Sequence, residues 1–280
     1  MTVATLKELL DPAASGGYAI AGLVVLGWEE ARAFVEAADE TGIPVILQAG
    51  PGCRKYTPVP ILGKMFRHLA EQSRTPVCPH IDHAYTLDEC REGIDHGFSS
   101  VMIDGSKLPI EHNIALTRQV VEIARPHGVS VESEVGFVGY TSGLAGRMTD
   151  PQEAQRFDRE SGADALAVSV GNVHLNTEKT SGIDLDALRA IEAVTRLPLV
   201  IHGGSGVPVA MRNRLARETR VAKFNIGTEL RMAFGRALRK SLGEQPEVFD
   251  RMALLGPTIA AVREETVGVI RAMGDVSRFS

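Results

Sequence analysis

The sequence predicts an α/β fold, a single (β/α)8 TIM barrel, and three observations support this class. Short apolar runs rich in β-branched residues alternate with amphipathic stretches of helical period along the whole chain. Eight such runs occur, without a change of composition that would divide the chain into two domains. A length of 280 residues is normal for one barrel of this kind. We therefore expect residues 1–280 to form one domain.

The expected strands are short runs bounded by turn-forming residues. In chain order they are Tyr18 to Val25, Pro44 to Gln48, Pro76 to His83, Ser99 to Ile103, Ser130 to Val135, Ala165 to Ser169, Pro198 to Ile201 and Val221 to Asn225. Because helical patterns separate them, we expect parallel strands joined by helical crossovers.

Several helical patterns open with a Thr or Asp at a plausible N-cap and end at a Gly. The clearest cover residues 86–97, 110–128, 150–162 and 184–195. After Leu230 the chain continues with two more helical patterns, RMAFGRALRKSLG and PTIAAVREETVGVIRAMG. This segment is longer than the single helix that would close the barrel. We therefore expect residues 231–280, approximately, to form a helical arm that packs on the barrel or on a second subunit.

Composition and charge exclude several classes of partner. The formal net charge is −5, with dispersed Lys and Arg, so we expect no nucleic acid partner. Apolar runs stay well short of the roughly 18 residues that a membrane span needs, and the N-terminus lacks the pattern of a signal peptide. We expect a cytoplasmic protein. Three cysteines without C-x-x-C spacing favour neither a disulfide framework nor a thiolate metal site.

Three histidines end or follow apolar runs, namely His83, His174 and His202. The carboxyl ends of barrel strands meet at one mouth, where converging imidazoles can hold a catalytic metal with an open coordination position. Neutral imidazole suits Zn²⁺ best, while Mn²⁺, Co²⁺ and Fe²⁺ remain compatible. The other polar side chains expected at this mouth are Gln48, Asp82, Asp104, Glu134 and Asn225.

Two loops have the features of a phosphate site. Gly203-Gly204-Ser205-Gly206 follows one expected strand, and a glycine backbone can present successive N–H groups to an anion. Asn225-Ile226-Gly227-Thr228 follows the last strand as a helix begins, and helix N-termini favour phosphate. Barrels commonly bind phosphate after strands seven and eight.

Five segments together resemble the class II, metal-dependent fructose-bisphosphate and tagatose-bisphosphate aldolases. They are HIDHAYTLDECREGIDHGFSSVMIDGSKLPIEHNI, VSVESEVG, DALAVSVGNVH, LPLVIHGGSG and VAKFNIGTEL, and the similarity extends from Gly16 to about Leu230. The resemblance implies that His83, His174 and His202 hold a catalytic zinc ion, and that Asp82 is the acid/base at the C4 hydroxyl of a phosphosugar. Asp104 and Glu134 match positions that can hold a second or displaced metal. The positions that match the dihydroxyacetone phosphate site are Gly203, Gly204, Ser205, Asn225, Gly227 and Thr228, and we add Gln48 as a substrate-binding residue. A homodimer or homotetramer is expected.

The chain departs from the family pattern on the side expected to hold the aldehyde. An active-site Asn of the family is Val24 here, and a Thr/Ser pair is Ala49-Gly50. The C-terminal Asp-Pro-Arg motif is reduced to Asp250-Arg251-Met252. Losing polar partners disfavours a phosphorylated, hydroxylated aldehyde. We therefore expect an aldehyde partner other than glyceraldehyde 3-phosphate.

Two loops also depart from the family. The stretch Gly139-Tyr140-Thr141-Ser142-Gly143 lacks the Glu that normally moves the enediolate proton, so Tyr140 or Ser142 are the candidate substitutes. Leu175 replaces a Gly that helps hold phosphate or a monovalent cation. A metal-dependent phosphosugar epimerase or isomerase, and a non-catalytic phosphosugar-binding relative, therefore remain as alternatives. A Schiff-base aldolase is less expected, because Lys223 lies within a strand that matches the metal-dependent family.

Overall fold

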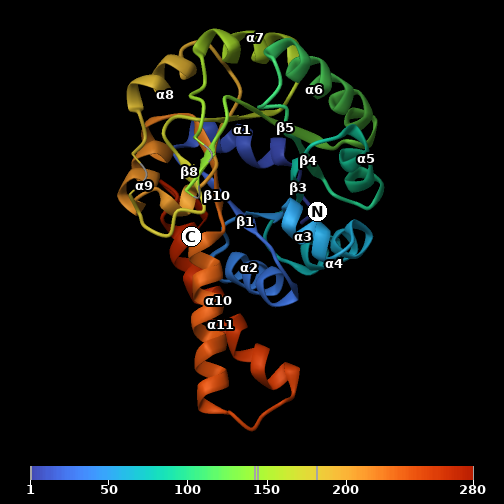
Figure 1. Ribbon diagram of the computed structural model, residues 1–280, viewed down its shortest axis with the longest axis vertical. Coiled ribbons are helices and arrows are strands. Elements are labelled where there is room, and N and C mark those ends of the chain that lie inside the picture. Colours follow the sequence, from blue (N-terminus) through green and yellow to red (C-terminus); the bar gives the residue numbers. More distant parts are fainter. Residues whose placement is uncertain (1, 142, 144, 181, 280) are drawn as a thin grey trace.

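The computed structural model describes residues 2–141, 143, 145–180 and 182–279. Its centre is a closed parallel barrel with strand order β1-β10-β9-β7-β5-β4-β3-β2, ringed by helices (Figure 1). The barrel strands are β1 (Ile20–Val24), β2 (Val45–Ala49), β3 (Val77–Ala84), β4 (Ser100–Ile103), β5 (Ser130–Val135), β7 (Ala165–Val168), β9 (Leu199–Ile201) and β10 (Val221–Ile226). The predicted fold class and all eight predicted strands are confirmed. The strands predicted from Pro44, Pro76 and Pro198 each begin one residue later, because proline has no N–H to donate to a neighbouring strand.

The helices lie outside the barrel, with one exception. They are α1 (Leu6–Gly16), α2 (Trp28–Thr41), α3 (Pro51–Tyr56), α4 (Val59–Gln72), α5 (Leu87–Asp95), α6 (Ile110–Ala124), α7 (Pro151–Ser161), α8 (Leu185–Glu192), α9 (Val209–Glu218), α10 (Thr228–Glu244) and α11 (Arg251–Arg271). The predicted N-caps are confirmed: the side chains of Thr86, Asp150 and Asp184 accept hydrogen bonds from backbone N–H groups in the first turns of α5, α7 and α8.

The exception is α1, which the strand and helix patterns did not predict and which closes the bottom of the barrel. Its buried Leu6, Leu9 and Leu10 join a core cluster with side chains inside the barrel, such as Ile46 and Val200. A larger apolar cluster fills the layer between the outer barrel face and the surrounding helices. The bottom of the barrel is therefore apolar, and the buried charged groups lie above this layer.

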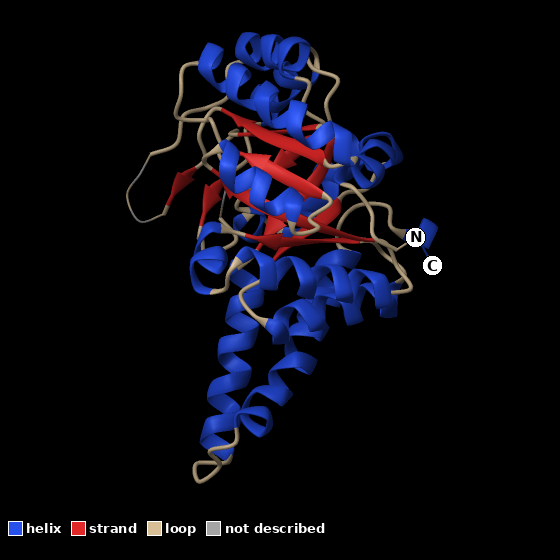
Figure 2. Cartoon of the chain, turned by 90° about the vertical axis from the view of Figure 1, so that its right-hand side faces the viewer, coloured by secondary structure: helices blue, strands red, loops and turns tan. Residues whose placement is uncertain are grey.

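The last two helices, α10 and α11, form an antiparallel pair that projects from the barrel (Figures 1 and 2). The second half of α11 returns to the barrel, where Val262, Val269 and Ile270 are buried and the helix packs on α2. The tail then crosses the barrel bottom, and Phe279 meets Tyr18 edge to face at 5.2 Å. None of the helices in the described ranges is long and apolar enough to cross a membrane.

Candidate active site

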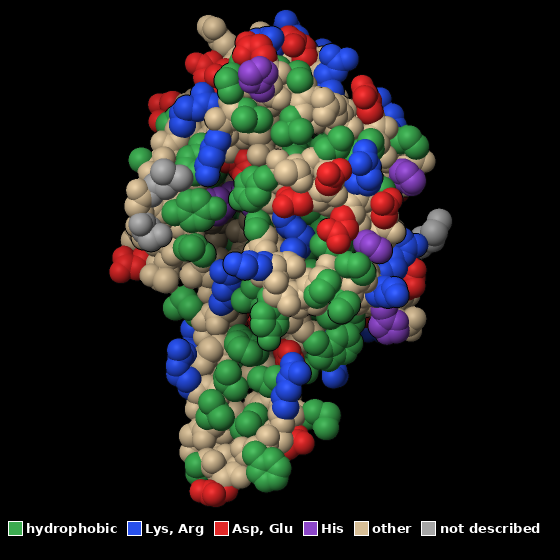
Figure 3. Space-filling model, turned by 45° about the vertical axis from the view of Figure 1, so that its right-hand side comes forward, with side chains coloured by type: hydrophobic (Ala, Val, Ile, Leu, Met, Phe, Trp, Pro, Cys, Tyr) green, Lys and Arg blue, Asp and Glu red, His purple; other side chains and the backbone are tan. Residues whose placement is uncertain are grey.

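The predicted site residues gather at the carboxyl ends of the strands, around a cavity of about 160 Å³. Figure 3 shows a hollow on this side of the molecule in which a histidine side chain is visible. The predicted residues that line the cavity are Asp82, His83, His174, Gly203, Ser205, Asn225, Gly227 and Thr228. Those that lie outside its lining, buried or nearly so, are Gln48, Asp104, Glu134, His202 and Gly204.

The three predicted histidines face one another. The ring centroids of His83 and His202 are 4.7 Å apart. The centroid of His174 lies 5.5 Å from that of His83 and 5.7 Å from that of His202. One nitrogen of each ring lies within 4.8 Å of a nitrogen of the other two rings. A second group, made of His83, Asp104 and Glu134, has one possible ligand atom from each residue within the same distance. Both sets are compatible with a divalent cation.

The polar atoms of this cluster include several without a partner in the described part of the chain. The Nε2 atom of His83, the Nδ1 atom of His202 and the Oε2 atom of Glu134 are buried without a hydrogen bond. The last two lie 3.2 Å apart, close enough for an ion pair but without hydrogen-bond geometry. Because unsatisfied buried polar atoms are costly, their convergence fits a cation bound between them.

His174 does not lie at the end of a barrel strand, as its apolar run suggested. That run ends with β7 at Val168, and His174 lies in β8 (Val173–His174), which pairs with β6 (Gly139–Tyr140) as a small separate parallel sheet. The hydroxyl of Thr141 donates to the His174 carbonyl at 2.9 Å, and the Tyr140 ring stacks on the imidazole at 4.9 Å. Burial and the neighbouring His202 and His83 lower the pKa of His174 to about 3.

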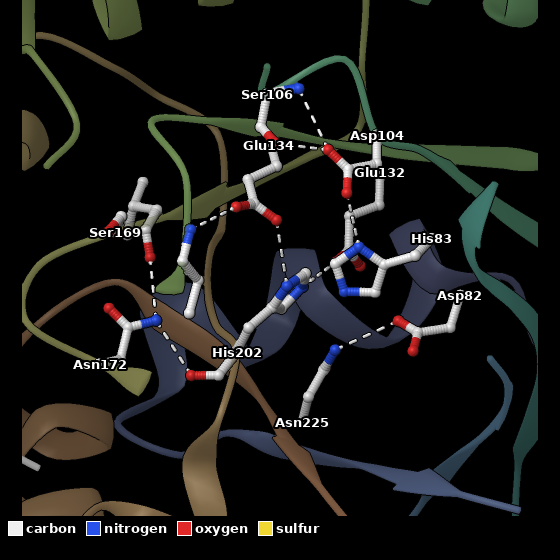
Figure 4. A network of polar contacts seen from close by, with 12 residues as sticks. Asp82, His83, Asp104, Ser106, Glu132, Glu134, Ser169, Asn172, His202 and Asn225 are labelled. Carbon is white, nitrogen blue, oxygen red and sulfur yellow. Dashed lines mark hydrogen bonds and ion pairs between the residues drawn. The ribbon is translucent and has the colours of Figure 1, made fainter. Parts of the chain in front are cut away.

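Two carboxylates lie beside the other two histidines, Asp104 beside His83 and Glu134 beside His202. Asp104 Oδ2 lies 2.9 Å from His83 Nδ1, while the backbone N–H and hydroxyl of Ser106 donate to its other oxygen (Figure 4). Glu134 Oε1 accepts a hydrogen bond from the Val138 N–H at 3.0 Å. Burial alone would lower the pKa of His83, but the Asp82 charge and the Asp104 hydrogen bond raise it. A carboxylate on the second ring nitrogen leaves Nε2 of His83 free for a metal.

Below the histidines lies a buried ionic network that was not predicted. Lys223 Nζ donates to Glu132 Oε2 at 2.6 Å, and Glu132 Oε1 lies 3.1 Å from His202 Nε2. Burial alone would raise the pKa of Glu132, but the Lys223 ammonium and His202 hold it well below its usual range. Burial would lower the pKa of His202, but the hydrogen bond with Glu132 and the neighbouring Glu134 carboxylate raise it to about 10. Lys223 and Glu132 are 91 residues apart in the sequence, so local patterns gave no sign of the pair.

Asp82 is buried beside this cluster, with one oxygen held and the other directed toward the cavity wall. Its Oδ1 accepts from Gln48 Nε2 at 2.9 Å and from Asn225 Nδ2 at 3.3 Å, so both amides bind the carboxylate. A Cβ on Gly50, which lines the cavity, would lie 3.5 Å from Oδ2. Burial would raise the pKa of Asp82, but His83 and Lys223 lower it, so the group is ionised at neutral pH.

The two glycine-containing loops lie on one side of the cavity. Gly203 has φ 66°, and a Cβ there would approach the Val173 carbonyl to 2.2 Å, so a larger residue would displace the loop of His174. The Ser205 hydroxyl accepts from the Gly227 N–H at 3.2 Å and the Glu229 N–H at 3.4 Å, which joins the loop to the start of α10.

Arg231 was not singled out from the sequence, yet it lines the same cavity from the first turn of α10. Its position three residues after Thr228 is the only sequence signal that could have indicated it. Ser142, a candidate for proton transfer, lies outside the described residues, whereas Tyr140 lines the cavity.

A closed parallel barrel with polar chemistry at the carboxyl ends of its strands defines a TIM-barrel enzyme. Residues 4–278 match the family model described as fructose-bisphosphate aldolase class-II. A fructose-bisphosphate aldolase of Geobacillus stearothermophilus is 34% identical over 281 residues, covering 98% of each chain. One of Staphylococcus aureus is 36% identical over 287 residues, covering 99% of each. The chain belongs to the class II fructose-bisphosphate aldolase family, and it is a carbon–carbon lyase that acts on a small phosphosugar.

Solved structures agree with this assignment. The crystal structure of the YdjI aldolase from Escherichia coli K12 superposes with a TM-score of 0.87 at 29% identity, covering 99% of this chain and 100% of that one. A fructose-bisphosphate aldolase structure from Campylobacter jejuni, at 23% identity and a TM-score of 0.83, has the same fold. The family is generally metal-dependent, which agrees with the donor set found here.

Proposed function

We propose that the protein is a zinc-dependent aldolase that cleaves or forms a ketose phosphate through the enediolate of dihydroxyacetone phosphate. The observation that carries this proposal is the convergence of His83, His174 and His202 beside the ionised Asp82. The cavity at this cluster is also lined by Gly203 and Ser205. Other divalent metals fit the same donors. A bound divalent cation would act as a Lewis acid that stabilises the negative charge developing on the substrate oxygens.

In the cleavage direction Asp82 accepts the proton of the C4 hydroxyl through Oδ2 as the C3–C4 bond breaks. Gln48 and Asn225 hold Oδ1, so the carboxylate keeps one orientation during the transfer. The carbon that was C3 must then gain a proton. We assign this proton to the Tyr140 hydroxyl, because the Tyr140 ring stacks on His174 and the residue lines the cavity. Burial and the nearby carboxylates raise the pKa of Tyr140, so its hydroxyl carries a proton at neutral pH.

The phosphate of dihydroxyacetone phosphate would be held by the Gly203 to Ser205 loop and by the N-terminus of α10. Gly203, Ser205, Gly227 and Thr228 all line the cavity, and backbone N–H groups at a helix N-terminus favour an anion. Leu175 also lines this cavity, and the proposal includes a monovalent cation near it that would help to hold the phosphate.

We also propose an aldehyde partner other than glyceraldehyde 3-phosphate. Val24 and Gly50 line the cavity and offer no side-chain hydrogen bond, so a polar group placed against them would lose its partners. Arg231 is the cationic side chain of this lining, and it would be the residue to hold a second phosphate if the substrate carries one.

The test is a product analysis with the zinc-loaded protein. Dihydroxyacetone phosphate and a panel of aldehydes are incubated with it, and carbon–carbon adducts are identified by mass. In parallel, kcat/KM for fructose 1,6-bisphosphate is expected to be lower than for a ketose 1-phosphate with a shorter or less polar tail. A clear preference for the bisphosphate would overturn the aldehyde assignment. A product of unchanged mass and altered stereochemistry would indicate an epimerase, and binding without turnover a non-catalytic relative.

The arm formed by α10 and α11 supports a homodimer or homotetramer. Phe249 at its tip is 95% exposed and Met252 is 79% exposed, and Figure 3 shows hydrophobic side chains along it. Exposed apolar side chains of this size are typical of a surface that a second subunit covers.

A further inference from the structure

Asp82 and His83 are neighbours in β3, yet both line the cavity. Successive side chains of a regular strand point to opposite faces. Ile81 follows this rule, since it packs outward against Gly93 of α5, where an added Cβ would approach it to 2.5 Å. In an unbroken strand His83 would point the same way as Ile81, away from the cavity.

A bulge at the end of β3 changes this direction. Ile81 pairs with Val101 of β4 and Ala84 with Ile103, so three steps along β3 correspond to two along β4. His83 has φ 51°, in the left-handed region that residues with a side chain rarely adopt. The extra residue and the left-handed backbone bring Asp82 and His83 to the same side. Because such a backbone is strained, the surrounding structure must hold it.

The residue that holds it is Arg54 of α3, whose side chain is only 8% exposed. Its Nη1 donates to the carbonyl of Ala49 at 2.5 Å and to that of Asp82 at 2.6 Å, and its Nη2 donates to the carbonyl of His83 at 3.0 Å. One guanidinium thus joins the end of β2 to both residues of the bulge. On its other side Nη2 lies 3.8 Å from Glu89, whose carboxylate also accepts the Tyr85 N–H at 2.6 Å.

We propose that Arg54 is a positioning residue, which fixes the bulge so that Asp82 and His83 both face the reacting substrate. It acts through backbone carbonyls and does not line the cavity. The planar fork of a guanidinium can donate to three carbonyls at once, whereas a lysine ammonium is a compact point charge on a flexible stem. The inference rests on the proposed metal-dependent function.

Cobalt(II) binding tests the proposal apart from catalysis. The full-length wild type is compared with Arg54→Ala, Arg54→Lys and the control Arg67→Ala, which removes an arginine from an exposed ion pair with Glu71 on α4. Arg54→Ala should weaken Co²⁺ binding roughly 10- to 100-fold, as loss of residues that orient metal ligands does, and should shift the visible spectrum of the bound ion. Arg54→Lys should lie between it and the wild type, and Arg67→Ala should match the wild type.

Added guanidinium ion should restore part of the Co²⁺ affinity of Arg54→Ala and leave Arg67→Ala unchanged. If Arg54→Ala does not fold, as judged by circular dichroism, Arg54→Lys carries the test through its weaker affinity and shifted spectrum. Wild-type affinity and spectrum in the folded variants would overturn the role of Arg54. A wild type that binds Co²⁺ but cleaves no ketose phosphate would overturn the proposed function alone, because the binding comparison remains valid.

Discussion

The two ends of the barrel are built from the same strands but are filled differently. At the bottom, α1 places Leu6 and Leu10 against apolar side chains such as Ile46 and Val200. From the layer above this cluster up to the mouth, the strands bury charged and polar groups, among them Glu132 and Lys223, both fully buried. Apolar burial stabilises a fold without directional demands, whereas each buried charge requires a partner at a defined distance. The bottom therefore supplies stability, and the top uses it to hold reactive groups in place.

The largest expected effect on activity comes from removing a metal ligand at the top. His174→Ala should abolish turnover and lose the bound ion with the fold intact, because His174 lies outside the barrel strands in the small β6–β8 sheet. Mass spectrometry measures the zinc content, and circular dichroism checks that the fold is intact. Chelation should likewise abolish wild-type activity, and Zn²⁺ should restore it. Full activity in excess chelator, or a lysine adduct trapped by borohydride, would contradict the metal mechanism.

The next effect concerns proton transfer at the same end. Asp82→Asn should keep the metal while lowering kcat at least about 100-fold, the lower end of what a positioned acid/base group contributes. The isosteric amide can still meet Gln48 and Asn225, so the site should keep its shape. Steady-state kinetics and metal analysis on the same preparation check this. If the variant loses its zinc together with its activity, Asp82 is structural.

A smaller effect is expected from pH, acting on metal affinity. In the metal-free protein the pKa of His202 is raised to about 10, so this ring holds a proton at neutral pH, and the pKa of His83 is raised as well, which favours its protonated form. Metal must displace these protons, and each one released should weaken the apparent Kd about tenfold for every pH unit of acidification. Calorimetry in buffers of different ionisation enthalpy counts them. An affinity that does not change from pH 8 to pH 6 would rule out this competition.

The smallest effect on turnover is expected at the bottom of the barrel. Leu10→Ala should lower the free energy of unfolding by about 2–5 kcal/mol, because the fully buried side chain leaves a cavity. Below the melting transition kcat should stay unchanged, since Leu10 packs in the apolar cluster at the bottom of the barrel and does not line the cavity. Ser15→Ala, at an exposed position of the same helix, is the matched control and should change stability by less than about 0.5 kcal/mol. A fall in kcat at full folding would mean that the two ends are coupled.

The sequence alone determined the barrel, its eight strands and the caps at Thr86, Asp150 and Asp184. These features depend on hydrophobic period and on hydrogen bonds within one turn, which neighbouring residues carry. It also predicted that His83, His174 and His202 would meet. The common mouth of a parallel barrel explains this for His83 and His202, whereas His174 reaches the same place from the β6–β8 sheet.

Only the tertiary structure decided how those residues face the substrate. The Lys223–Glu132 pair, the β6–β8 sheet that carries His174 and the clamp of Arg54 on the bulge at His83 all join segments far apart in the chain. A bulge adds one residue to a strand and reverses the direction of a side chain without altering the hydrophobic pattern. Local sequence therefore specified which groups are present, and non-local contacts specified where they point.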